Sequence, residues 1–104
     1  MEAKSPIILI VEDEELLLNA IARKIKASRM STILCKSGRE AIEILKKGDI
    51  LPSAIWLDYY LKDMDGLDFM NALKENNKWL HIPTIVVSNS ASPDNVSNMI
   101  ALGV

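Results

Sequence analysis

The sequence is poor in the residues on which disulfides, zinc sites and nucleic-acid contacts depend. Cys35 is its only cysteine, which excludes an internal disulfide and a cysteine-based zinc site and fits a reducing compartment. The net charge is only -2, and the 12 Lys and Arg residues are scattered, so no basic face is available to gather the phosphates of DNA or RNA. We therefore expect no direct nucleic-acid partner.

Long apolar runs are also missing. No stretch approaches the roughly 18 apolar residues that a membrane span requires, and the N-terminal sequence M-E-A-K-S-P is acidic and lacks an apolar core. We expect a soluble, cytoplasmic protein with no membrane partner. The lone Cys35 is interpreted as a small buried hydrophobe at the end of a strand.

What the chain does contain is the composition of one globular domain. Its 104 residues are 49% hydrophobic and 25% charged, which fits a single modest core and neither a disordered segment nor a multidomain enzyme. There is no linker, low-complexity tract or close repeat. We therefore expect one domain over residues 1–104.

Short apolar strands alternate with helical patterns along the whole chain. The expected strands are Ile7–Val11, Ser31–Cys35, Ala54–Leu57 and Thr84–Val87. The expected helices run from Glu14 to about Ser28, from a Ser37/Glu40 capping box through Lys47 to Gly48, from Gly66, and from Ser92 with Pro93 behind it. Such alternation predicts an α/β fold, a doubly wound parallel sheet with right-handed crossovers and helices on both faces.

Apolar residues at helical spacing indicate which side of each helix faces the sheet. The inward residues are expected to be Leu18, Ile21, Ala22 and Ile25 in the first helix, Leu67, Met70 and Leu73 in the third, and Val96, Met99, Ile100 and Gly103 in the fourth. Trp56, Trp79, Met64 and Met70 are interpreted as packing residues and not as a ligand cage.

Oxygen-bearing side chains stand where the apolar strands end. Glu12 and Asp13 follow the first strand, Asp58 the third, and Ser88 with Asn89 the fourth. In open parallel sheets, ligands bind beyond the carboxyl ends of the strands. Crowded carboxylates repel one another unless a cation neutralises them, and all-oxygen ligands favour Mg²⁺ or Mn²⁺ over zinc. A carboxylate at such a metal can accept a phosphoryl group.

Each of these residues also has an ordinary structural interpretation. Glu12 and Asp13 suit the positive end of a helix dipole, Asp58 can begin a turn, and Ser88 can be a simple strand-end hydroxyl. The combination favours a site, because separate apolar strands all end in a suitable oxygen ligand.

Four motifs together resemble the response regulator receiver domains of two-component signalling, including chemotaxis regulators. They are V-E-D-E, L-D-Y-Y-L-K-D-M-D-G, V-V-S-N and A-L-G-V, in that order, and the resemblance spans about residues 7 to 104. It implies a flavodoxin-like strand order 2-1-3-4-5. It also implies Asp58 as phosphoacceptor, Asp13 as direct Mg²⁺ ligand, Glu12 acting through water, the Tyr60 carbonyl as ligand, and Ser88 as switch hydroxyl.

The sequence departs from that family in three places. The family usually has Pro at the position of Lys62, which suggests a more mobile loop, and a very small residue at the position of Asn89, which borders the approach to Asp58. The fifth strand, its phosphoryl-pairing Lys and the fifth helix do not follow Val104, and no Lys present matches that cation. We expect a C-terminally truncated receiver with strand order 2-1-3-4.

The resemblance implies a signalling switch and not an enzyme. A histidine kinase or phosphotransfer protein would donate the phosphoryl group to Asp58, and protein contacts would change in response. One alternative is a Mg²⁺-dependent aspartate-based phosphohydrolase, although Tyr60 stands where its second Asp belongs. Another is a receiver-like interaction module that is not phosphorylated. His81, in the turn before Pro83, is not expected to be a phosphodonor.

The missing elements also predict an exposed apolar surface. Without a fifth strand and helix, the strand Thr84–Val87 becomes an edge and one face of the sheet is uncovered. We expect self-association through that edge or face, or marginal stability. A monodisperse monomer of ordinary stability would contradict this expectation.

Overall fold

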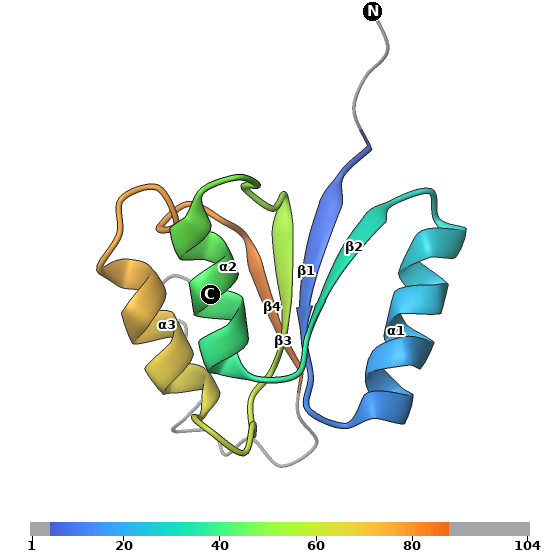
Figure 1. Cartoon of the computed structure of the whole chain (residues 1–104), viewed down its shortest axis with the longest axis horizontal. Coiled ribbons are helices and arrows are strands. Elements are labelled where there is room, and N and C mark those ends of the chain that lie inside the picture. The colour runs from blue at the N-terminus through green and yellow to red at the C-terminus, as the bar shows by residue number, and fades with distance from the viewer. Residues whose placement is uncertain (1–4, 88–104) are drawn as a thin grey trace, which may run out of the picture.

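The computed structural model describes residues 5–87, in which strands and helices alternate along the chain (Figure 1). The elements in order are β1 (Ile7–Val11), α1 (Glu15–Ala27), β2 (Ser31–Cys35), α2 (Gly38–Lys47), β3 (Ala54–Asp58), α3 (Gly66–Lys74) and β4 (Thr84–Val87). The helix expected from Ser92, with Val96, Met99, Ile100 and Gly103, lies outside the described residues. Within residues 5–87, the predicted alternation is confirmed.

The strands form one parallel sheet in the order β2-β1-β3-β4, as predicted. In the register, Ile10 of β1 pairs with Leu34 on one side and with Trp56 on the other, while Trp56 in turn pairs with Ile85 of β4. The chain thus moves outward from β1 to β2, crosses back past β1 to β3, and continues to β4. The reversal of strand order falls between β1 and β3.

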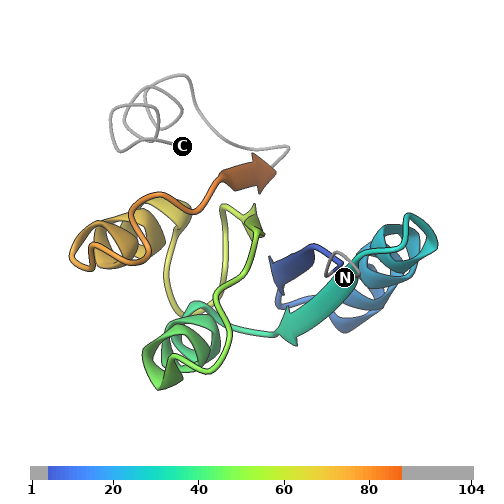
Figure 2. The same ribbon diagram turned by 90° about the horizontal axis from the view of Figure 1, so that it is seen from above.

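Helices cover both faces of the sheet. Figure 2 shows α1 on one face and α2 with α3 on the other. The larger core lies under α2 and α3, where Leu9, Leu57 and Phe69 are fully buried. A smaller core of Ile10, Leu18 and Ala22 lies under α1. Because residues alternate between faces along each strand, the unbroken apolar runs supply both cores.

Most of the expected packing residues lie in these cores. Met70, Leu73 and Trp79 are buried in the larger core, with Leu67 and Met64 partly buried against it. On the other face, Ile21, Ile25 and Trp56 pack partly buried against the smaller core. Cys35 is a buried free cysteine at the end of β2, as predicted, and burial raises the pKa of its thiol to about 12.

The start of α2 differs in one detail from the predicted capping box. The Ser37 hydroxyl accepts the Glu40 N–H at 3.0 Å, as expected, but the Glu40 carboxylate accepts the N–H of Lys36 at 3.2 Å and not that of Ser37. The prediction that the Glu40 carboxylate accepts the Ser37 N–H, which is the reciprocal half of the capping box, was therefore wrong. A full capping box is present at α3, where Asp65 and Asp68 exchange bonds between side chains and backbone. Asp substitutes there for the usual Glu or Gln.

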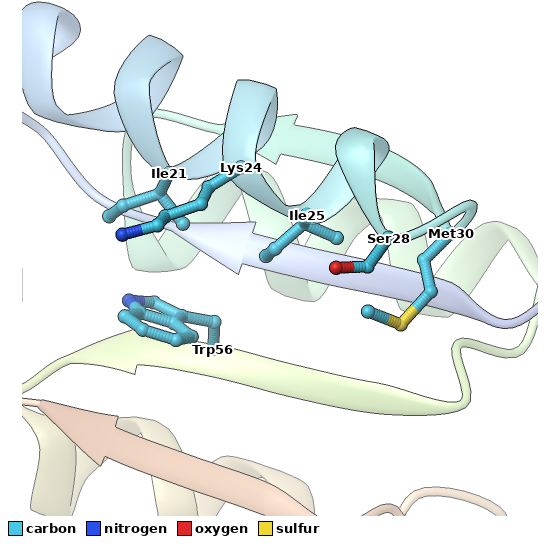
Figure 3. Close-up of a pocket in the computed structure, with 6 residues that line it drawn as sticks. All are labelled: Ile21, Lys24, Ile25, Ser28, Met30 and Trp56. Atoms are coloured by element: carbon cyan, nitrogen blue, oxygen red, sulfur yellow. The ribbon is translucent and has the colours of Figure 1, made fainter.

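An apolar hollow separates α1 from β3. Figure 3 shows Trp56 of β3 facing Ile21, Lys24 and Ile25 of α1, and the hollow has a volume of about 230 Å³. A neighbouring hollow of about 220 Å³ extends it toward β4 and reaches Ile85, whose side chain is 54% exposed. Apolar residues therefore line an open surface between α1 and β4 within the described residues. Self-association through it stays a prediction.

Among residues 5–87, no helix combines the length and the apolar character needed to cross a lipid bilayer.

Candidate functional site

Three carboxylates meet at the carboxyl ends of β1 and β3. Val11 and Leu57 are register partners, so the next residues along the two strands, Glu12 and Asp58, emerge side by side, with Asp13 adjacent. Carboxylate oxygens of Glu12, Asp13 and Asp58 all lie within 4.8 Å of one another. The structure thus brings together three residues that the sequence predicted to share one rim, at the reversal of strand order where open sheets bind ligands.

Backbone amides orient all three carboxylates. The Glu14 N–H donates to Glu12 Oε2 at 2.9 Å, and the Lys62 N–H donates to Asp13 Oδ2 at 2.8 Å. The Tyr60 N–H donates to Asp58 Oδ1 over a longer distance of 3.4 Å. These donors are neutral, so they position the carboxylates without cancelling their charge.

The charge in the cluster is therefore only partly offset. Burial raises the pKa of Glu12, and repulsion from Asp58 and Asp13 adds to the rise, against the opposing hydrogen bond from Glu14. Burial likewise raises the pKa of Asp58, and repulsion from Asp13 adds to it, while hydrogen bonds from Tyr60 and Glu12 oppose the rise. A cation placed among these oxygens would reverse both effects.

The donor set fits a hard divalent cation. Three carboxylates from two strands offer oxygen atoms only, and within residues 5–87 this is the group of His, Cys, Asp and Glu side chains close enough to share one ion. Glu12 is buried, while Asp13 and Asp58 are half-buried, so the cluster is partly accessible to solvent. Zinc, which prefers nitrogen and sulfur ligands, fits this cluster less well.

The segment between β3 and α3 contacts the site through the Lys62 amide and is itself attached to α2. Its Asp63 carboxylate accepts the N–H groups of Gly38 and Arg39 at 3.0 and 2.9 Å, at the first turn of α2. Sequence reasoning missed Asp63, and it also missed the amide of Lys62. Asp63 is one of two aspartates in this turn, and nothing in the sequence shows which backbone N–H groups will donate to the site.

Other predicted residues are only partly placed. Ser88 and Asn89 lie outside the described residues. The amide of Tyr60 lies beside Asp58, but the role of its carbonyl as a metal ligand stays a prediction. The Tyr60 ring packs edge-on against the buried Tyr59 ring, with centroids 4.7 Å apart. His81 is exposed in the turn before β4.

Comparison with known proteins identifies the family. The sequence model described as the response regulator receiver domain matches residues 8–104, and this chain belongs to that family. Receiver domains are in general signalling domains of two-component systems. They interact with histidine kinases or phosphotransfer proteins and bind Mg²⁺ at an acidic pocket.

Individual relatives agree with this assignment. The chain is 35% identical to the polar-differentiation response regulator DivK of Brucella ovis, over 78% of this chain and 64% of that protein. It is 30% identical to the sensor histidine kinase CheAY of Helicobacter pylori, over 80% of this chain and 10% of that protein. The chain thus spans less than two thirds of either relative.

Solved structures confirm the flavodoxin-like receiver fold. A response regulator receiver protein from Pseudomonas putida superposes with a TM-score of 0.88 at 19% identity, covering 99% of this chain and 84% of that one. The Vibrio cholerae chemotaxis protein CheY4 gives the same TM-score and identity, over 96% and 82%. At 19% sequence identity, the similarity to these two structures is evidence for the fold alone.

Proposed function

We propose that this chain is a phosphoacceptor receiver in which Asp58 takes a phosphoryl group from a histidine kinase or phosphotransfer protein. The observation that supports the proposal is the meeting of Glu12, Asp13 and Asp58 within 4.8 Å, in a chain of the receiver family. Asp58 ends β3 and is held by the sheet. Of the three acids, Asp58 is the one that belongs to a strand of the sheet.

In the proposed transfer, a carboxylate oxygen of Asp58 attacks phosphorus. An O–P bond forms, the N–P bond of a phosphohistidine breaks, and the imidazole leaves with the electron pair. The Tyr60 N–H holds Asp58 Oδ1 in place, so attack by the other oxygen requires little reorientation. The expected products are an aspartyl phosphate and, when the phosphohistidine ring carries a proton on its other nitrogen, a neutral histidine on the donor.

Bound Mg²⁺ would offset the repulsion between the carboxylates and the incoming phosphoryl group. We propose that Asp13 and Asp58 hold it directly, that the Tyr60 carbonyl contributes a further oxygen, and that Glu12 acts through water. Glu12 is the most buried of the three acids and is held by the Glu14 amide, which suits a supporting role. Ser88 is proposed as the hydroxyl that contacts the transferred group.

The outcome of phosphorylation is proposed to be a change in protein contacts, so the chain serves as a switch and not as an enzyme with its own product. A cytoplasmic location is part of the proposal, because Cys35 is a free thiol.

Mass spectrometry tests the proposal directly. The chain is incubated with acetyl phosphate and MgCl₂, and its intact mass is measured with and without EDTA. We expect one added phosphoryl mass that depends on Mg²⁺ and is lost in Asp58→Asn. Asp49→Asn, which removes an exposed aspartate after α2, is the matched control and should be phosphorylated normally.

Two results would count against a phosphoacceptor role for Asp58. The absence of added mass would favour a receiver-like interaction module. Added mass that survives Asp58→Asn would place the acceptor elsewhere.

A further inference from the structure

Three large apolar side chains are exposed at the end of the molecule opposite the acidic site. Ile50 and Leu51, in the segment that joins α2 to β3, are 42% and 60% exposed, and Leu80, in the segment that joins α3 to β4, is 42% exposed. Figure 1 shows both segments at the amino ends of the strands, whereas the acidic site lies at the carboxyl ends of β1 and β3. The proposed phosphoryl transfer uses none of these apolar residues.

A hollow of about 220 Å³ lies between the two segments. The residues that line it come from the end of α2, the segment after α2 and the segment before β4, and they are Leu45, Gly48, Ile50, Leu51, Lys78 and Trp79. Small-molecule sites commonly have volumes of about 300–1,000 Å³. This hollow is smaller, so it suits one apolar side chain of a protein partner better than a whole metabolite.

The charged residues beside the hollow are mostly positive. Residues 45–51 and 78–82 contain three lysines, Lys46, Lys47 and Lys78, and one acidic residue, Asp49. All three lysines are exposed, and Lys78 belongs to the lining itself. Carboxylates next to the apolar side chain of a partner would therefore be attracted to this surface, whereas a second copy that presented the same surface would be repelled.

We infer that the surface formed by Ile50, Leu51, Lys78, Trp79 and Leu80, called here the docking surface, binds a segment of a partner protein in which an apolar side chain lies next to carboxylates. The apolar side chain enters the hollow against Trp79, and a carboxylate pairs with Lys78. Apolar anchors in pockets supply much of the affinity of protein interfaces, and charges at the rim supply specificity. The inference does not depend on phosphorylation, so it can fail while the proposed function stands.

A peptide titration followed by NMR tests the inference on the isotope-labelled full chain. The probe is a short capped peptide with one phenylalanine flanked by glutamates, and a matched peptide has lysines in place of the glutamates. We expect the amide signals of Leu51, Lys78 and Trp79 to shift with the acidic peptide and to shift much less with the basic one. No shift of these signals with the acidic peptide, or equal shifts with both peptides, would overturn the inference.

Two substitutions on the docking surface separate its apolar and charged parts. Leu51→Ser removes exposed apolar surface and Lys78→Glu reverses the charge at the hollow, so each is expected to weaken binding of the acidic peptide at least about fivefold. The matched controls Leu16→Ser and Lys26→Glu make the same changes at exposed positions of α1 and are expected to bind the peptide like the unchanged protein. Equal affinity of all four variants would contradict the assigned surface.

Two further measurements distinguish other occupants of the docking surface. Cosedimentation of the chain with vesicles of phosphatidylcholine and phosphatidylglycerol that Lys78→Glu prevents would show a lipid-binding surface and overturn the inference. Self-association in analytical ultracentrifugation that Leu51→Ser abolishes would show that a second copy occupies the surface, which would also overturn it. The expected result is binding of the acidic peptide without binding to the vesicles and without self-association that depends on Leu51.

Discussion

At the scale of single residues, the site combines strong positioning with unrelieved charge. Glu12, Asp13 and Asp58 are each held by a neutral amide, and no cationic side chain is paired with any of them among the described residues. Burial and mutual repulsion therefore raise the pKa values of Glu12 and Asp58. A site of this kind is strained when it holds no cation and relaxes when one binds.

The raised pKa of Asp58 makes stability depend on pH. A carboxyl whose pKa is raised by folding binds its proton more tightly in the folded chain than in the unfolded chain. The free energy of unfolding therefore falls as the pH rises above 3.8, the ordinary pKa of an aspartate. Asp58→Asn removes the ionisable group. In EDTA, we expect this variant to melt at a higher temperature than the unchanged protein at pH 7, with the advantage disappearing as pH falls below 3.8.

Thermal melting followed by circular dichroism across this pH range checks the prediction. Asp49→Asn, an exposed aspartate outside the cluster, controls for the change in net charge. If Asp58→Asn melted at no higher temperature than the unchanged protein at pH 7, the Asp58 carboxylate would not destabilise the folded chain. The same would follow if the difference in melting temperature grew on acidification.

The sequence predicted the acidic members of the site because strand ends are visible in it. A buried apolar run stops at Val11 and another at Leu57, and parallel strands bring their carboxyl ends to one rim. The amide of Lys62 and the anchoring carboxylate of Asp63 could not be predicted in this way. Both depend on the path of an irregular segment, which no periodic pattern describes.

At the scale of elements, two helix ends use the same left-handed backbone with different residues. The C-cap of α2 is Gly48, with φ of 72°, whereas the turn after α1 places Arg29 at φ of 63°. Each residue donates its N–H back to the helix it follows, Gly48 to Leu45 and Arg29 to Lys26. Glycine adopts this conformation freely, while other residues pay about 1–2 kcal/mol for it.

Replacing Arg29 by glycine is therefore expected to stabilise the fold. Relief of the left-handed backbone exceeds the larger chain entropy that glycine gives the unfolded state, which costs about 0.5–1 kcal/mol, so the expected net gain is roughly 0.5–1 kcal/mol. Urea unfolding measures it. Arg29→Ala removes the same exposed side chain without relieving the backbone, and a gain of similar size in that variant would contradict the explanation.

The opposite change at Gly48 should destabilise α2. A Cβ added at Gly48 would have no atom within 4 Å, so the cost of Gly48→Ala is conformational and not steric crowding. We expect a loss of about 1 kcal/mol in the free energy of unfolding by urea. Gly48→Asn should lose less, because asparagine tolerates the left-handed region. An alanine variant as stable as the unchanged protein would show that this helix end is not sensitive to its backbone conformation.

Element boundaries followed closely from sequence where local chemistry sets them. The strand Ser31–Cys35 and the helix between Ser37 and Gly48 have their predicted bounds, because a cap hydroxyl and a terminal glycine mark α2 on both sides. Phe69, fully buried in α3, was not among the predicted inward residues. Which stripe of a short helix faces the sheet depends on tertiary packing, which spacing alone does not fix.

At the scale of the whole molecule, the two faces of the sheet are unequally covered within the described residues. Under α2 and α3 lies a large core that includes Phe69 and Leu57, whereas the face under α1 leaves Trp56 partly buried and Ile85 54% exposed. The acidic site is built from the ends of the two central strands, β1 and β3. Its geometry therefore depends on the pairing of these strands and exists only in the folded chain.

Cation binding should for that reason stabilise the fold as a whole. Asp13 and Asp58 lie within reach of one ion in the folded protein, but they lie far apart along an unfolded chain, which binds Mg²⁺ weakly in comparison. A ligand that binds only the folded state at about 100 times its dissociation constant adds roughly 2.7 kcal/mol of stability. We expect MgCl₂ to raise the urea midpoint accordingly, and Asp13→Asn to lose most of that rise.

Sodium chloride at matched ionic strength separates site binding from general screening, which also weakens repulsion among exposed charges. If NaCl raised the midpoint as much as MgCl₂, the carboxylates would be responding to screening and would not form a binding site. A rise that is specific to Mg²⁺ and is lost in Asp13→Asn would connect the three scales. The carboxylate of one residue would then help to bind the ion, and the ion would stabilise the pairing of β1 with β3.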